Sequence, residues 1–382
     1  MKKPLKRWKI TIKTMEKTNK PIQSLYVHIP FCAHICSYCD FSKVLYDEKW
    51  AFSYIKELEK EINSYKIDHK LETIYIGGGT PTCLNDELLE ELLKFLSPFL
   101  KDNGEFTIEG NPENITENKL RILKDEGINR LSMGLESSNE KFLKMMGRKH
   151  TYEDTKRAVN LAKRYGISNI SVDIIYALPG ETLEDLNKDI DALLALDVPH
   201  LSSYSLTVSP GTLFYNRGYK EIDDEISAAM YELILNRLEE AGYERYEVSN
   251  YAKDKKYSRH NLTYWHDNEY YGVGLGASGY VNNVRYTNTR SLKEYLNGNY
   301  VAEKEELTLR SRLEDYFLTN LRLAEGFKKD DFQERFSFSF SNRYKTQLEK
   351  LKNDGLLKED EDSIYPTNKG ILLLDRILLT LF

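Results

Sequence analysis

Three cysteines that lie within eight residues are the part of this chain best suited to chemistry. Cys32, Cys36 and Cys39 stand in the segment C-A-H-I-C-S-Y-C, directly after an apolar, strand-like run. Structural zinc sites and ordinary iron–sulfur clusters take four protein ligands. Here the series stops at three, because Phe41 occupies the next candidate position. Three thiolates on one loop can bind three irons of a [4Fe–4S] cluster and leave the fourth iron open to a small chelating molecule.

The alternative is that these thiols are ordinary buried or solvated side chains, since free cysteine often behaves as a small core hydrophobe. The chain has only four cysteines, and three of them are clustered. Chance clustering explains this pattern poorly, so we interpret the loop as a metal site.

A second motif, G-G-G-T-P-T at residues 77–82, follows another strand-like run one strand–helix unit later. Glycines let the backbone approach a ligand closely, so that N–H and C=O groups point into the site. A glycine-rich turn alone is weak evidence. Its place directly after the unit that carries the cysteines makes it a candidate for holding a molecule bound to the cluster.

Both motifs lie within a regular alternation of strand-like and helix-like segments. Six runs rich in β-branched and aromatic residues are predicted to be strands, at 24–29, 72–76, 105–109, 129–135, 169–176 and 200–206. Segments with apolar residues at i, i+3 and i+4 lie between them, such as 84–100, 152–165 and 181–195. The alternation predicts an α/β fold with a parallel sheet, compatible with a partial (β/α)6 barrel. In such sheets the chemistry collects at the carboxyl ends of the strands.

The rhythm changes after about residue 220. A predicted helix at 223–241 leads into an aromatic, glycine-rich stretch, and the chain from 309 onward is mainly helical, like a winged-helix module. We expect four parts: a basic disordered leader (1–23), a core (24–220), a barrel extension (221–308) and a C-terminal helical module (309–382).

Composition narrows the class of protein. A formal net charge of −6 argues against general nucleic-acid binding. No apolar run is long enough to span a bilayer, and few, clustered cysteines indicate a metal site in a reducing compartment. Residues 1–20 carry eight Lys and Arg against the single acid Glu16, without the apolar run of a secretory signal. A start at Met15 and a weak attraction to anionic lipid remain open for this leader. We expect a cytoplasmic protein that touches membranes only peripherally.

Several segments together resemble the radical S-adenosylmethionine (SAM) superfamily and, within it, the oxygen-independent coproporphyrinogen III oxidase family. They are L-Y-V-H-I-P-F-C-A-H-I-C-S-Y-C, G-G-G-T-P-T, N-R-L-S-M-G, D-I-I-Y-A-L-P-G and R-H-N-L-T-Y-W, and the resemblance spans about residues 24–380. It implies a partial (β/α)6 barrel, a [4Fe–4S] cluster on the three cysteines, and SAM bound to the open iron through its amine and carboxylate.

Two branches of that family differ in two features. The coproporphyrinogen dehydrogenases, HemN, carry another cysteine two residues after the third cluster ligand, where this chain has Phe41. The haem chaperones, HemW, lack it and carry the motif H-N-x-x-Y-W, matched here by His260, Asn261, Tyr264 and Trp265. Both features favour the chaperone branch, which implies haem and a haem-requiring acceptor, respiratory and membrane-bound in the family. The alternatives are radical decarboxylation of coproporphyrinogen III and another radical SAM reaction.

The resemblance also implies roles for single residues. Gly78, Gly79 and Thr80 would hold the SAM amino group, Glu109 would accept the ribose hydroxyls, and Arg148 would pair with the carboxylate. Further SAM contacts are implied at Tyr26, Tyr38, Glu136 and Asp173. Asp173 interrupts an otherwise apolar predicted strand, where a buried acid needs a partner.

Two residues depart from the family pattern. Glu136 stands where a Gln normally contacts SAM, and an ionised Glu there would repel the SAM carboxylate unless it is protonated or paired. Ser209 replaces an acid that is common before P-G-T. For haem, His260 offers an axial ligand beside Tyr264, with His266 as a second candidate. Without the resemblance, a histidine among aromatics is more often a packing residue.

Overall fold

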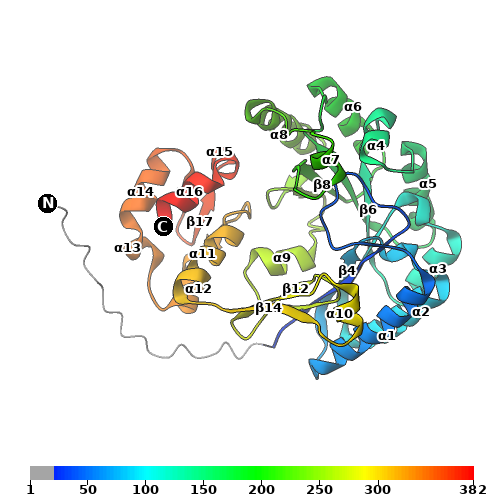
Figure 1. Ribbon diagram of the computed structural model, residues 1–382. Coiled ribbons are helices and arrows are strands. Elements are labelled where there is room, and N and C mark those ends of the chain that lie inside the picture. Colours follow the sequence, from blue (N-terminus) through cyan, green and yellow to red (C-terminus); the bar gives the residue numbers. More distant parts are fainter. Residues whose placement is uncertain (1–20) are drawn as a thin grey trace.

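The computed structural model describes residues 21–382 (Figure 1). Residues 1–20 of the predicted leader lie outside the described part of the chain. The largest feature is a nine-stranded sheet in the order β11-β1-β4-β5-β6-β7-β8-β10-β9. Its six central strands are all parallel, as predicted. They are β1 (Ser24–Ile29), β4 (Leu71–Gly78), β5 (Leu100–Gly110), β6 (Arg130–Glu136), β7 (Asn169–Tyr176) and β8 (His200–Ser205).

Three short strands extend the sheet at its two ends. β11 (Tyr271–Val273) pairs parallel with β1, whereas β10 (Asn250–Ala252) and β9 (Glu244–Arg245) continue antiparallel from β8. The predicted partial (β/α)6 barrel is therefore confirmed, with edges supplied by the segment after residue 220. These edge strands come from the aromatic, glycine-rich stretch, to which the sequence had assigned no strands.

Helices cover the outer face of the sheet (Figure 1). They are α1 (Glu48–Ser64), α2 (Asp86–Leu96), α3 (Glu117–Asp125), α4 (Glu140–Met146), α5 (Tyr152–Arg164), α6 (Leu183–Leu194) and α8 (Asp224–Glu240). Threonine side chains start α5 and α6 in capping boxes with the acid three residues later. Apolar residues on one face of each strand, such as Leu25, Val27 and Ile29, pack in the core against these helices. Alternate residues therefore face the barrel interior.

A three-stranded antiparallel sheet follows the barrel, made of β12 (Ser278–Val281), β13 (Val284–Asn288) and β14 (Val301–Glu306). The other short elements near the barrel are β2 (Phe31–Cys32), β3 (Val44–Leu45), α7 (Leu213–Asn216), α9 (Arg259–Trp265) and α10 (Leu292–Leu296).

The C-terminal module has its own core of aromatic and aliphatic side chains, among them Phe317, Phe332 and Phe340. Its helices are α11 (Leu309–Asn320), α12 (Lys329–Phe336), α13 (Phe340–Arg343), α14 (Lys345–Asn353), α15 (Asn368–Leu372) and α16 (Leu374–Leu381). They pack with a small sheet of β15 (Phe327–Lys328), β16 (Leu357–Glu359) and β17 (Ser363–Pro366). Small strands among helices agree with the winged-helix-like character expected from the sequence.

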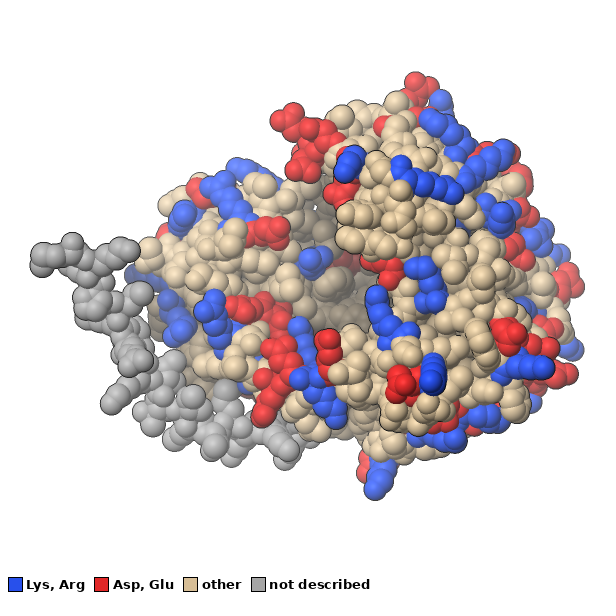
Figure 2. Space-filling model, viewed as in Figure 1, with Lys and Arg blue, Asp and Glu red and all other residues tan. Residues whose placement is uncertain are grey.

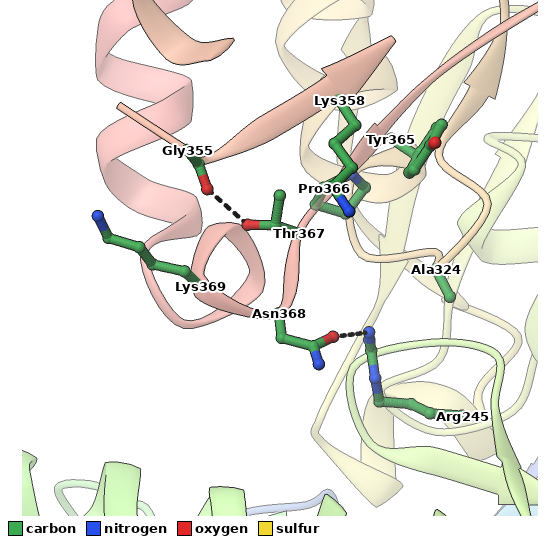
Figure 3. A pocket seen from close by; sticks show the side chains of 9 residues that line it. All are labelled: Arg245, Ala324, Gly355, Lys358, Tyr365, Pro366, Thr367, Asn368 and Lys369. Carbon is green, nitrogen blue, oxygen red and sulfur yellow. Dashed lines mark hydrogen bonds between the residues drawn. The ribbon is translucent and has the colours of Figure 1, made fainter. Parts of the chain in front are cut away.

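Polar contacts join this module to the barrel. Arg245 of β9 donates to the Asn368 side chain (2.9 Å) beside a cavity of about 460 Å³, which Lys358 and Lys369 also line (Figure 3). Arg335 forms an ion pair with Asp267 (2.8 Å). Within residues 21–382, no helix has the length and apolar character needed to cross a membrane.

Candidate functional site

The cysteine loop begins at the carboxyl end of β1. Cys32 lies in β2, and the parallel pairing of β2 with β3 closes residues 33–43 into a loop. Cys32 is buried, and Cys36 and Cys39 are half-buried. Cys83 instead contacts the Phe31 carbonyl (3.3 Å) from a separate turn. The loop thus supplies three thiols without a fourth.

These thiols fit a cluster better than a single metal ion. Within residues 21–382, no group of three or more His, Cys, Asp or Glu side chains is arranged to hold one metal ion. Thiolates that bind different irons of a cube need not meet at one point. Burial raises the pKa of Cys32 to about 11, so its thiol is protonated until a metal displaces the proton.

The glycine turn lies directly against the end of β1. The N–H groups of Gly79 and Thr80 donate to the carbonyls of Ile29 and Phe31 (both 2.8 Å), and Gly78 N–H donates to Glu109 (3.0 Å). A Cβ on Gly79 would lie 2.7 Å from the Phe31 carbonyl oxygen, so only glycine fits there. Because these N–H groups are engaged, carbonyl oxygens are what the turn can offer a ligand. A carbonyl accepts hydrogen bonds, which suits an ammonium group.

Glu109 ends β5 and faces the same region. Its carboxylate accepts hydrogen bonds from Tyr75 (2.7 Å) and from the Gly78 backbone (3.0 Å). Burial raises its pKa, with Glu136 adding to the effect. Tyr26 lies deeper in the barrel, stacked on Tyr75 with ring centroids 6.1 Å apart. Sequence reasoning missed Tyr75, which alternation along β4 would have placed inside the barrel.

Asp173 of β7 also faces the interior. Ser171 and Ser132 donate to its carboxylate at 3.1 and 3.4 Å, which supplies the partners that a buried acid needs. Burial raises the pKa of Asp173 to about 7, so near neutral pH both the protonated and the ionised forms of this carboxyl are accessible. It can therefore accept a hydrogen bond from a ligand or donate one to it.

Glu136, the first departure from the family pattern, has a partner. Its Oε1 accepts a hydrogen bond from the Tyr38 hydroxyl (3.0 Å) and lies 3.6 Å from Nη1 of Arg148. Arg148 also donates to the Gly134 carbonyl (2.8 Å) and contacts the Cys36 sulfur (3.5 Å). The arginine thus neutralises the carboxylate, the pairing that was needed to prevent repulsion toward SAM.

Ser209, the second departure, lies on the segment before α7. Its hydroxyl donates to the Asp40 carboxylate (3.0 Å), just after the third cysteine. An acid therefore lies beside Ser209 even though residue 209 itself is not acidic.

His260 lies at the opposite end of the barrel from the cysteines. Its ring is bonded at both nitrogens, to Thr73 Oγ1 (2.8 Å) and to the Tyr264 hydroxyl (2.7 Å), and the residue is 1% exposed. Backbone N–H groups of Arg259 and His260 donate to Glu105 (3.1 and 3.0 Å), which pairs with Thr73 across β4 and β5. Both ring nitrogens are thus engaged in this conformation, whereas an axial ligand requires an accessible nitrogen lone pair, and the role of His260 as a haem ligand stays a prediction.

His266, at the end of α9, is more accessible. Its side chain is 39% exposed, and Nε2 lies 3.8 Å from Glu325. Trp265 beside it has a buried indole nitrogen that finds no hydrogen-bond partner within residues 21–382, and Arg322 lies over its ring at 5.6 Å. The accessible histidine of this segment is therefore the second candidate rather than the first.

The interior is open to solvent at the carboxyl end of the strands. Tyr204, near the carboxyl end of β8, is 42% exposed. The face seen in Figure 2 is hollowed near its centre, where Figure 1 shows the large sheet. A molecule bound at the cysteines would thus face a polar, tyrosine-lined space.

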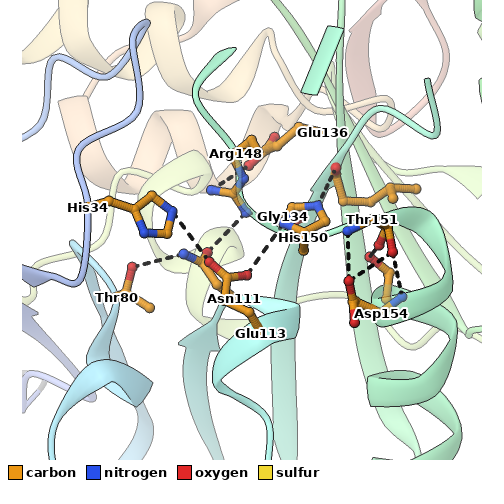
Figure 4. Close-up of polar contacts among 12 residues, drawn as sticks. His34, Thr80, Asn111, Glu113, Gly134, Glu136, Arg148, His150, Thr151 and Asp154 are labelled. Carbon is orange, nitrogen blue, oxygen red and sulfur yellow. Dashed lines mark hydrogen bonds and ion pairs between the residues drawn. The ribbon is translucent and has the colours of Figure 1, made fainter. Parts of the chain in front are cut away.

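Sequence reasoning also missed a polar group around Arg148. Asn111 accepts from Arg148 (3.0 Å) and donates to Thr80 (3.3 Å), while Glu113 lies between His34 and His150 (Figure 4). Asn111 and Glu113 follow β5, so their position after a strand end was the available signal.

Comparisons with known proteins agree with this geometry. A family model of the radical SAM superfamily matches residues 26–193, and a model of the HemN C-terminal domain matches residues 307–373. The chain is 40% identical over 359 residues to a protein named heme chaperone HemW from Lactococcus lactis, covering 92% of this chain and 94% of the relative. Proteins of the same name from Bacillus subtilis and Escherichia coli are 38% and 33% identical, covering 92% and 94% of this chain and 97% of each relative.

One solved structure is similar along nearly the whole chain. It is the coproporphyrinogen III oxidase HemN from Escherichia coli, described as a radical SAM enzyme. The TM-score is 0.82 with 24% identity, covering 95% of this chain and 90% of that one. At this identity the likeness shows the fold alone.

Proposed function

The chain belongs to the radical SAM superfamily and, within it, to the heme chaperone HemW family, and on that premise we propose that it binds a [4Fe–4S] cluster, SAM and haem and delivers haem to an acceptor protein. The observation that carries the proposal is identity of 38–40% over most of the chain with proteins named heme chaperone HemW.

Cys32, Cys36 and Cys39 would hold the cluster, which supplies an open iron for SAM when bound. The turn at 78–80 would accept hydrogen bonds from the SAM ammonium through its carbonyl oxygens. Glu109, already fixed by Tyr75 and Gly78, would accept hydroxyl donors on the ribose. Arg148 would share its charge between Glu136 and the SAM carboxylate.

For haem, we propose the end of α9 as the binding element. His266 is the accessible histidine there, with Trp265 beside it as an aromatic surface for a macrocycle. Arg322, which lies over the Trp265 ring, brings a positive charge to this region, which would suit a carboxylate of haem. The acceptor would be a haem-requiring protein, and contact with a membrane-bound respiratory partner belongs to this proposal.

The rival function is decarboxylation of coproporphyrinogen III by the same cofactors. Phe41, which is 63% exposed, occupies the position of the extra cysteine that the resemblance assigns to that enzyme. The remaining thiol of the chain, Cys83, lies on a separate turn and donates to the Phe31 carbonyl (3.3 Å), so it does not occupy the position of that extra cysteine.

The test begins with anaerobically reconstituted protein. Haem should give a Soret band that survives desalting, and the loaded protein should pass haem to an apo-haem acceptor mixed with it. With SAM, reductant and coproporphyrinogen III, no decarboxylated product should accumulate. Sustained product formation would favour the dehydrogenase, and failure to retain haem would remove the chaperone function.

A further inference from the structure

The segment from Met146 to His150 docks against the cysteine loop. The Ser37 N–H donates to the Met146 carbonyl (2.8 Å), and Nη1 of Arg148 lies 3.5 Å from the Cys36 sulfur. Gly147 between them has a φ of +78°, and a Cβ there would lie 3.3 Å from the Ser37 hydroxyl. The second cysteine is therefore held from outside its own loop, by a segment that needs a glycine to approach it.

A carboxylate makes a second connection between the same two parts of the chain. His34 lies between the first two cysteines, and its Nε2 is 3.5 Å from one oxygen of Glu113. The other oxygen of Glu113 is 3.4 Å from Nδ1 of His150, whose side chain has no exposure to solvent (Figure 4). Each oxygen thus faces an imidazole from a different segment.

The facing atoms of this bridge are not drawn into closer hydrogen bonds elsewhere within the described chain. The two oxygens of Glu113, Nε2 of His34 and Nδ1 of His150 are buried and make no hydrogen bond that meets ordinary limits. The other nitrogen of His150 lies 3.0 Å from the Leu135 carbonyl, which fixes the ring. Burial opposes ionisation of Glu113, but His150 and Arg148 hold its pKa below the ordinary value. A charged carboxylate therefore lies between two imidazoles, at distances that a small loop movement would bring into hydrogen-bond range.

We propose that Glu113 is a positioning residue for the cluster. It links His34 in the cysteine loop to His150 and thereby fixes the position of Cys36 relative to Arg148, without binding iron itself. The inference rests on the cluster that the proposed function assigns to the three cysteines. Asn111, two residues before Glu113, accepts a hydrogen bond from Arg148. The turn after β5 therefore contacts both the arginine and, through Glu113, the cysteine loop.

The test compares iron retention in reconstituted protein. Glu113→Ala should lose its cluster to an iron chelator about tenfold faster than the wild type, the ratio that corresponds to about 1.4 kcal/mol. Glu113→Gln, which keeps the size and one acceptor, should lose it at an intermediate rate. His34→Ala should act like Glu113→Ala, and the double variant should be no faster, because both changes remove one bridge. Glu117→Gln, an exposed acid on α3, is the matched control.

A second readout separates positioning from folding. The EPR spectrum of the reduced cluster should shift in the Glu113 variants, while thermal unfolding of the cluster-free proteins shows whether the fold is retained. If Glu113→Ala does not fold, the rate of iron loss from Glu113→Gln is compared with that from the wild type instead. Wild-type rates of iron loss in folded Glu113 variants, or additive effects of the His34 and Glu113 changes, would overturn the inference. A wild type that binds no cluster would instead refute the cofactor assignment in the proposed function.

Discussion

Replacing His260 by alanine should destabilise the fold rather than remove an iron ligand. The imidazole is buried and bonds to Thr73 Oγ1 (2.8 Å) and the Tyr264 hydroxyl (2.7 Å), and its ring packs 5.1 Å from that of Tyr75. We expect the free energy of unfolding to fall by about 3 kcal/mol.

The magnitude follows from the groups left behind. Thr73 keeps a hydrogen bond to Ser24 (2.9 Å) in the variant. The loss of its bond to His260 should therefore cost an amount at the low end of the usual range, about 1 kcal/mol. Within the described chain the Tyr264 hydroxyl hydrogen-bonds to His260 (2.7 Å), and the loss of this partner costs about 1–2 kcal/mol. The space vacated by the ring adds roughly another 1 kcal/mol.

Urea unfolding followed by tryptophan fluorescence measures this change, with His266→Ala as the control. His266 is half-buried and its ion pair with Glu325 is long (3.8 Å), so its loss should change stability by less than about 0.5 kcal/mol while weakening haem binding. Haem titrations at a temperature where both variants are folded complete the comparison. Our reasoning is refuted if His260→Ala has wild-type stability but no longer binds haem, because His260 would then leave the barrel to bind iron.

Three further predictions concern the cluster, SAM and pH. Cys83→Ser should leave iron content and cluster absorbance unchanged, because Cys83 lies on a separate turn and its thiol donates to the Phe31 carbonyl. Cys36→Ser should instead lose the cluster, and iron loss from the Cys83 variant would show a fourth ligand. Glu136→Gln should tighten SAM binding several-fold in an EPR titration of the reduced cluster, since it frees Arg148 for the SAM carboxylate, and unchanged affinity would mean that the pair is not broken by SAM. Burial lowers the pKa of His260 from 6.5 to about 3, so below pH 6.5 the unfolded chain binds a proton that the folded chain does not bind. The contribution of the neutral ring to the free energy of unfolding is therefore fully present above pH 6.5. It should fall by about 1.4 kcal/mol per pH unit as the pH drops toward 3. His260→Gln should show a shallower acid dependence in urea midpoints, and an equal slope would contradict burial of a neutral ring.

The strands of the barrel could be predicted because their local sequence and their environment agree. The runs at 24–29 and 169–176 are β-branched and apolar, and β1 and β7 have these bounds in the structure. β5 begins at Leu100, earlier than predicted, because pairing of Leu100 with Leu71 overrides the low strand propensity of the polar residues that follow. Tertiary contacts of this kind are invisible to a local pattern.

The site divides in the same way. Cysteine spacing and the glycine turn follow from neighbouring residues, so both were recognisable in the sequence. The contacts of Glu113 with His34 and His150 join three separate segments, and only the folded barrel brings them together. His260 shows the opposite case: its motif was recognisable, but whether its ring points to solvent or into the barrel depends on Thr73 in a distant strand.

α9 lies across the amino ends of β1, β4 and β5 and so closes the barrel at the end opposite the cysteines. Ser24 and Thr73, near the starts of β1 and β4, and Glu105 of β5, which pairs with Thr73, are all hydrogen-bonded to side chains or backbone of this helix. A molecule lodged among the inner tyrosines cannot leave past these strands. The rim, where the cysteine loop lies, offers a path for exchange, and a molecule bound there would slow the release of one bound deeper inside.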